Sequence, residues 1–126
     1  MDALAGLLDG PRAREAFLLR CVMGRPWSMR IQDEAPLSVV AVVRGHAWVI
    51  PDGGDAVELH PGDVAVARGP VPYTFCDDPA SPTQIVIHPG QRCTTPGGVE
   101  LVEALSLGVR TWGNDPHGST AMLVGT

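Results

Sequence analysis

Short apolar runs, separated by glycine- and proline-bearing turns, fill the sequence from about residue 15 to its end. The chain has 15 glycines and 12 prolines among 126 residues, and they lie between the apolar runs rather than in repeats. Within most runs the apolar side chains recur at every second position, which is the period of a β-strand. Glycine and proline supply the backbone conformations of tight turns. The pattern therefore predicts an all-β sandwich or barrel of many short strands.

The alternation within each run also predicts which side chains share a face. In WSMRI, Arg30 falls on the face opposite Trp27 and Met29. LSVVAVV is nearly continuous and predicts a strand that is buried on both faces, or nearly so. The runs interpreted as strands are EAFLLRCVM, WSMRI, LSVVAVV, HAWVI, AVEL, VAVA, YTFC, TQIVIH, GVRTW and STAMLVG.

Two segments depart from the two-residue period. DALAGLLDG near the N-terminus has Leu4, Leu7 and Leu8 at helical spacing, so it predicts one short helix. Asp2 is placed to cap its start, and the Gly-Pro pair that follows would end it. CTTPGGVELVEALSL, residues 93–107, is ambiguous, and we expect a loop with a short strand or a helical turn.

Composition and charge limit the function classes. Hydrophobic residues make up 44% of the chain and the formal net charge is −5, with only arginine as the basic residue type. No stretch gathers these arginines, so direct contact with nucleic acid is not expected. There is no signal-peptide pattern and no apolar run that could span a membrane. Three cysteines at irregular spacing fit a cytoplasmic protein with reduced thiols.

Two neighbouring stretches resemble the motif regions of the cupin superfamily of small jelly-roll barrels. VVAVVRGHAWVI carries Gly45 where the first motif has its glycine, and HPGDVAVARGPVPYTF carries the Pro-Gly-Asp turn as Pro61, Gly62 and Asp63. From about Trp27 onward, the order and spacing are similar to the N-terminal effector-sensing cupin domain of bacterial AraC-type transcription regulators.

This resemblance implies the fold, the role and the partners. The fold would be a cupin-like jelly-roll β-barrel with a short N-terminal helix, forming a single ligand-sensing domain over residues 1–126. A small-molecule effector would bind inside the barrel, and the chain would not be an enzyme. The DNA-binding helix-turn-helix domain is expected after residue 126 and is absent from this chain. A homodimer is a further possible assembly.

The resemblance also implies where metal-dependent cupins hold their ion. Two histidines would fall within residues 31–34, a glutamate near Ser38 and a third histidine at Tyr73. None of these positions is histidine. The usual ligand set is therefore missing, which argues against metal catalysis of the family type.

His88 and Cys93 form an alternative metal candidate. They flank a Pro-Gly turn, and imidazole with thiolate suits zinc or another transition metal. A third ligand such as Cys76 or His117 would have to join them. A histidine hydrogen-bonded to backbone and a cysteine acting as a small hydrophobe is the competing interpretation. The alternative function is thus a small metal-binding cupin protein or enzyme, and a third is a dimerisation module with a filled core.

Aromatic and polar side chains are the candidates for effector binding. Tyr73 is the first choice, because it takes the inward ligand position and its hydroxyl can hydrogen-bond. Arg30 would pair with an acidic effector if it points inward, but it cannot share the cavity with Trp27 and Met29, and the sequence leaves this open. Further polar ends are Arg110, His46 and Gln84. The predicted ligand-binding set is Trp27, Arg30, Trp48, Tyr73, Phe75 and Trp112.

Overall fold

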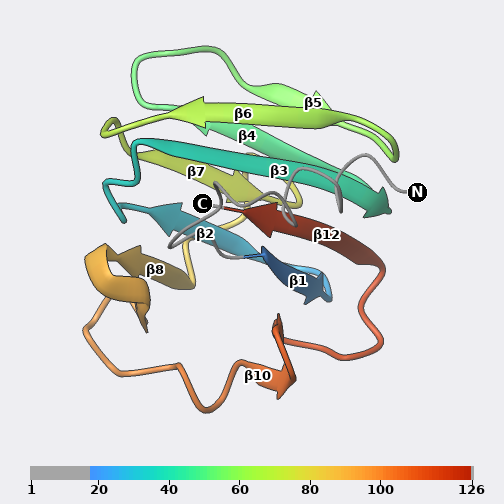
Figure 1. The fold of residues 1–126 in the computed structure, drawn as a ribbon, viewed down its shortest axis with the longest axis vertical. Coiled ribbons are helices and arrows are strands. Elements are labelled where there is room, and N and C mark those ends of the chain that lie inside the picture. Colours follow the sequence, from blue (N-terminus) through green and yellow to red (C-terminus); the bar gives the residue numbers. More distant parts are fainter. Residues whose placement is uncertain (1–17, 126) are drawn as a thin grey trace, which may run out of the picture.

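The computed structural model describes residues 18–125 of the chain. The helix expected near the N-terminus therefore lies outside the described residues. Within them, twelve strands form two six-stranded sheets that face each other as a jelly roll (Figure 1). The only helical element of the described part is a 3₁₀ turn, η1 (Pro89–Gln91). The all-β jelly-roll prediction is confirmed.

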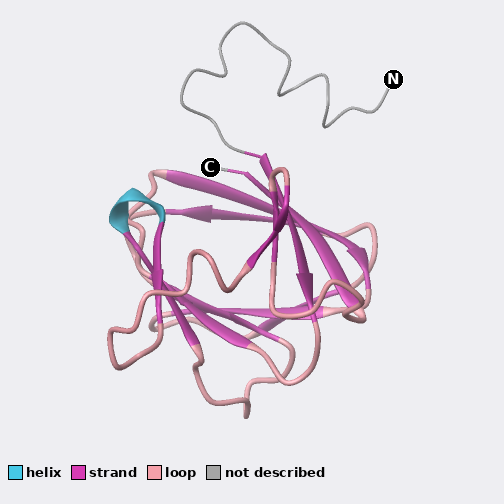
Figure 2. Ribbon diagram, turned by 90° about the horizontal axis from the view of Figure 1, so that it is seen from below, coloured by secondary structure: helices cyan, strands magenta, loops and turns pink. Residues whose placement is uncertain are grey.

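The strands of each sheet come from distant parts of the sequence. The first sheet contains, in spatial order, β10 (Ser106–Gly108), β11 (Thr111–Trp112), β1 (Leu18–Met23), β12 (Thr120–Gly125), β3 (Leu37–Arg44) and β6 (Val64–Arg68). The second sheet contains β5 (Val57–Leu59), β4 (Ala47–Pro51), β7 (Tyr73–Cys76), β2 (Ser28–Ile31), β8 (Ile85–His88) and β9 (Arg92–Thr94). Seen along the barrel in Figure 2, the two sheets enclose a common interior.

The predicted turns carry the chain from one sheet to the other. Gly45 lies between β3 and β4 with a φ of 77°, a conformation that glycine adopts without strain. The Pro-Gly-Asp turn joins β5 to β6. In it, the Asp63 amide donates to the His60 carbonyl at 2.9 Å, and the His60 amide donates to Asp63 Oδ2 at 2.8 Å. These contacts explain why the Pro-Gly-Asp motif ends a strand of one sheet and starts a strand of the other.

The prediction that β3 is buried on both faces is wrong. Its inward residues Ser38, Val40 and Val42 are buried, but Leu37 is 48% exposed and Val43 is 58% exposed on the outward face. β3 lies between β12 and β6, so its backbone is fully paired while one side-chain face points away from the barrel. The nearly continuous apolar run therefore marks a central strand of the sheet and not the burial of both of its faces.

Large apolar side chains fill one end of the barrel. The Trp27 and Phe75 rings meet edge to face, with centroids 5.3 Å apart and planes at 81°. Met23, Met29 and Met122 are fully or almost fully buried in the same core cluster. Edge-to-face aromatic packing of this kind stabilises a core beyond the area it buries.

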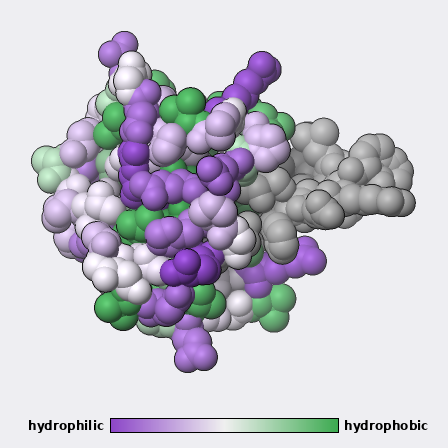
Figure 3. Space-filling view, turned by 90° about the vertical axis from the view of Figure 1, so that its left-hand side faces the viewer, coloured by the Kyte–Doolittle hydropathy of each residue, from purple (hydrophilic) through white to green (hydrophobic). Residues whose placement is uncertain are grey.

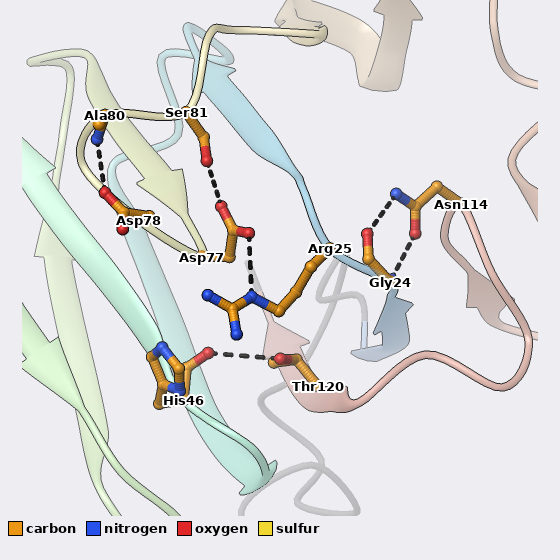
Figure 4. A network of polar contacts seen from close by, with 9 residues as sticks. All are labelled: Gly24, Arg25, His46, Asp77, Asp78, Ala80, Ser81, Asn114 and Thr120. Atoms are coloured by element: carbon orange, nitrogen blue, oxygen red, sulfur yellow. Dashed lines mark hydrogen bonds and ion pairs between the residues drawn. The ribbon is translucent and has the colours of Figure 1, made fainter.

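A network of polar contacts closes the same end (Figure 4). Buried Asp77 accepts a hydrogen bond from Ser81 Oγ at 2.6 Å and faces Arg25 Nε at 3.6 Å. The Asn114 side chain accepts from the Gly24 amide at 2.6 Å and donates to the Gly24 carbonyl at 2.9 Å. These contacts join the β1–β2 connection to the loops after β7 and before β12.

The outer surface is mixed in polarity. The side of the molecule in Figure 3 is hydrophilic across much of its centre, with separate hydrophobic groups around it. Among residues 18–125, no helix has the length and hydrophobicity needed to cross a membrane.

Candidate functional site

A cavity of about 320 Å³ lies between the two sheets. Along β2 it begins at Ile31, whereas Trp27 packs in the closed end of the barrel. On the second sheet its wall is one row of paired residues from four adjacent strands. Cys93 pairs with Ile87, Ile87 with Ile31, and Ile31 with Tyr73. Side chains of paired residues point to the same face, so this row lines the cavity continuously.

The first sheet supplies the opposite wall. Leu19 of β1 and Val124 of β12 are paired, and both line the middle of this wall. At one end of it stand Arg110 and Trp112, next to β1. At the other end stands Ser38 of β3. The cavity therefore extends across four adjacent strands of the second sheet and, because Ser106 and Gly108 of β10 also line it, across five of the first.

The segment that was ambiguous in the sequence contributes the remaining wall. The Leu101 amide donates to the Cys93 carbonyl at 2.9 Å, and the Leu105 amide donates to the Leu101 carbonyl at 3.0 Å, which closes a single hydrogen-bonded turn. Leu105 is buried, and it lines the cavity with Val102 and Ser106. The expected loop with a short strand or a helical turn is confirmed as a loop with one turn that leads into β10.

Tyr73 lines the cavity together with the polar side chains of Asp33 and Ser38. Burial raises the pKa of Tyr73, its hydrogen bond with Ser38 lowers it, and the nearby charge of Asp33 raises it, with a net pKa above the ordinary 10.0. The phenol is therefore protonated at neutral pH and can both donate and accept. Asp33 is held in the loop after β2, where its Oδ1 accepts a hydrogen bond from the Ala35 amide at 3.1 Å.

A comparison with protein families identifies the fold family. A family model described as Cupin matches residues 2–126. The chain belongs to the cupin family. No curated protein and no solved structure gives a significant match.

Residues from all the regions that the resemblance assigns to metal ligands, namely 31–34, Ser38 and Tyr73, converge in this cupin. Asp33, Ser38 and Tyr73 all line the one cavity. One carboxylate, one hydroxyl and one protonated phenol are a poor set for a transition metal, which favours imidazole or thiolate ligands. In the described part of the chain, no three His, Cys, Asp or Glu side chains lie together so that they could hold a metal ion. The residues at this position do not fit the metal centre.

His88 and Cys93 are not brought together. Cys93 pairs with Ile87 and lines the cavity, whereas His88 pairs with Arg92, one position along, on the opposite face of the hairpin. His88 Nε2 lies 2.8 Å from Thr94 Oγ1 on that face. The alternation of side chains within a strand, which the turn between β8 and β9 preserves, places these two candidate ligands on different faces.

The six candidate ligand-binding residues divide between three environments. Tyr73 and Trp112 line the cavity. Trp27 and Phe75 pack against each other in the closed end of the barrel. Trp48 alternates with the inward residues of β4 and lies half-buried on the outside of the second sheet. Of the six candidate residues, the structure thus places only Tyr73 and Trp112 in the cavity.

The sequence left open whether Arg30 or Trp27 lines the cavity. On the outside of the second sheet, the Arg30 guanidinium donates two hydrogen bonds to the Asp52 carboxylate. The bond from Nη1 to Oδ1 is 2.6 Å long. This contact raises the pKa of Arg30 and lowers that of Asp52, in both cases chiefly through the hydrogen bonds. Neither Arg30 nor Trp27 lines the main cavity, and Ile31 takes the inward place.

Sequence reasoning missed several residues of the cavity. In the sequence, the 31–34 range that contains Asp33 and the position of Ser38 indicated only missing metal ligands, and Arg110 was one of several polar side chains. Of Arg110, His46 and Gln84, only Arg110 lines the cavity. The motif positions that hold metal ligands in other cupins were the available signal. Such positions face the barrel interior whichever residue occupies them. Nothing in the sequence marked Leu105.

Proposed function

We propose that this cupin is a regulatory domain that binds a small-molecule effector in its cavity, within an AraC-type transcription regulator. The observation that carries the proposal is the 320 Å³ cavity, which is lined by residues at the positions that the motif resemblance assigns to metal ligands. Most of its walls are apolar, and a few polar groups are placed among them, as is usual for small-molecule sites. The regulator assignment rests on the resemblance of the motifs described above.

The state of the reactive groups in the cavity supports binding rather than catalysis. Burial raises the pKa of Cys93 above its ordinary 9.0, and the charge of Glu100 raises it further. The pKa of Tyr73 is also raised. Both groups are therefore protonated at neutral pH, and a thiol or phenol in that state is a weak nucleophile and a weak base.

The arrangement of the walls suggests how binding would be transmitted. The cavity is bounded by β1, β3 and β12 in the first sheet and by the 93–107 loop at its edge. An effector that contacts both the loop and the sheets would favour one loop position over others. It would shift that equilibrium only by its difference in affinity for the two positions.

A cavity-blocking variant tests the binding site. Val102 lines the cavity and Val99, in the same loop, does not, although both are more than half exposed. We expect compounds from a metabolite library to raise the melting temperature of the wild type and of Val99→Trp. Val102→Trp should lose that response, because the indole ring occupies the cavity. Equal responses of the two variants, or no stabilising compound in the whole library, would contradict the proposal.

The regulator assignment has separate tests. The coding sequence that follows codon 126 should encode a basic segment with two helix-turn-helix motifs. A following segment without DNA-binding character would contradict it. The possible homodimer stays a prediction, and sedimentation equilibrium of the purified chain measures it directly.

A further inference from the structure

The polar groups of the cavity gather at its two ends, and the middle is apolar. Leu19, Val124, Ile31 and Ile87 form the middle, two from each sheet. On the first sheet, Arg110 next to β11 and Ser38 of β3 are separated by β1 and β12. Three strand spacings amount to about 14 Å between backbones. The space is therefore elongated, and its two ends can recognise different chemical groups.

The end next to β3 and β7 offers hydrogen-bond acceptors. It is formed by Asp33, Ser38 and Tyr73. Asp33 Oδ1 accepts from a backbone amide, and its second oxygen makes no hydrogen bond to any residue in the described part of the chain. A carboxylate beside two hydroxyl groups suits a ligand hydroxyl or ammonium that donates, since bonds to a charged acceptor are the stronger ones.

The end next to β11 offers a cation. Arg110 and the hydroxyl-bearing Ser106 both line the cavity there. The Arg110 guanidinium makes no hydrogen bond or ion pair with the described residues, whereas Arg30 is held by Asp52 and Arg92 by Glu100. Arg110 has a φ of 49°, rare outside glycine, and its carbonyl accepts from the Arg20 amide at 2.8 Å. Such backbone strain is concentrated at binding sites.

We propose that the effector is an elongated carboxylate with an apolar body and a hydroxyl or ammonium group at its far end. The carboxylate binds Arg110 through paired hydrogen bonds, and the donor at the far end binds Asp33 and Tyr73. The apolar body lies between the isoleucines of the second sheet and the Leu19–Val124 pair of the first. This inference rests on the proposed function, because it names the ligand class of the same cavity.

Matched probes test the two ends separately by isothermal titration calorimetry. The parent series is 4-hydroxyphenylacetate, 3-(4-hydroxyphenyl)propionate and 4-(4-hydroxyphenyl)butyrate, which differ only in length. For the best binder, one analogue lacks the hydroxyl and another has an alcohol in place of the carboxylate. Each analogue should bind about tenfold more weakly or worse, because each leaves a charged partner unmatched.

Variants assign each loss to its residue. The Arg110→Gln variant should bind the carboxylate probe and its alcohol analogue with equal affinity. The double variant Tyr73→Phe, Asp33→Asn should bind the parent probe and the analogue without the hydroxyl with equal affinity. Arg20→Gln is the matched control, since Arg20 lies on the neighbouring strand with its side chain exposed and absent from the cavity wall. It should bind like the wild type, and equal losses in Arg20→Gln and Arg110→Gln would overturn the assignment.

The outcomes separate this inference from the proposed function. If no member of the hydroxy-carboxylate series binds, but neutral apolar compounds give a response that Val102→Trp abolishes, the ligand class is wrong and the binding function stands. If no compound of any class gives a Val102-dependent response, the binding function fails as well. Equal affinity of the parent probe and both analogues would also reject the ligand class.

Discussion

Three tryptophans show how differently one residue type is used in this barrel. Trp27 is fully buried against Phe75, Trp48 is half-buried on the outside of the second sheet, and Trp112 lines the cavity. In the sequence all three stand in short apolar runs and were equal candidates for ligand contact. Which environment each tryptophan occupies depends on which strands meet inside the barrel. The alternation of side chains within one strand does not show this.

Replacement of the buried tryptophan should be the most costly of the three for stability. We expect Trp27→Ala to lower the free energy of unfolding by about 3–5 kcal/mol, because it leaves a large void beside Phe75. Urea denaturation followed by circular dichroism measures the loss. Trp48→Ala is the control and should cost clearly less, since its ring is only half-buried. A Trp27→Ala protein as stable as Trp48→Ala would show that the closed end is not the packed core described above.

At the level of elements, the turns were the most predictable part of the fold. The Gly45 turn and the Pro-Gly-Asp turn both stand where the sequence placed them. Turn residues act through their own backbone preferences, so they can be identified without knowledge of the partners. The error over β3 has the opposite origin. Its apolar run is intrinsic, but exposure of its outer face depends on what lies beyond the sheet.

Two glycines of similar conformation provide a matched test of the β3–β4 turn. Gly45 and Gly53 have φ values of 77° and 74°. A Cβ at position 45 would lie 2.6 Å from the Ser119 carbonyl oxygen, whereas nothing lies within 4 Å at position 53. Gly53→Ala should therefore lower the free energy of unfolding by roughly 1 kcal/mol, which is the strain of the left-handed backbone alone.

Gly45→Ala should lower the free energy of unfolding distinctly more than Gly53→Ala. It adds to the same backbone strain a clash with backbone atoms that cannot move aside. Thermal and urea unfolding of the two variants side by side measure the difference. Equal losses would mean that the approach of the β3–β4 turn to the segment before β12 is looser than these contacts indicate.

On the scale of the whole molecule, the cavity is assembled from residues that are far apart in the chain. Its walls combine β1 near the start, β12 at the end and the loop after β9. The fold also determines the accessibility of the three cysteines. Cys21 and Cys76 are buried, and burial is the main cause that raises their pKa values to about 12 and about 11. Cys93 instead lines the cavity.

Thiol modification measures this difference in accessibility. In the folded protein, a maleimide should label Cys93 alone, whereas all three cysteines should react in urea. Cys93→Ser should remove the native-state labelling. Because the thiolate is the reactive form and the pKa of Cys93 is raised, the labelling rate should still increase with pH, by about tenfold per unit, between pH 7 and pH 9. A rate that levels off near pH 7, or native labelling of Cys21, would contradict this arrangement.

The sequence by itself determined the class of fold, the turns and the lack of a cupin metal-ligand set, because period, turn chemistry and residue type are local properties. Counting along the motifs also indicated the 31–34 range, Ser38 and Tyr73 as the places where metal-dependent cupins have their ligands. Only the tertiary structure decided that Arg30 faces outward to Asp52, that His88 and Cys93 lie on opposite faces, and that Arg110 and Tyr73 share one cavity. These outcomes depend on the register and order of strands distant in sequence, where a shift of one residue reverses every side chain.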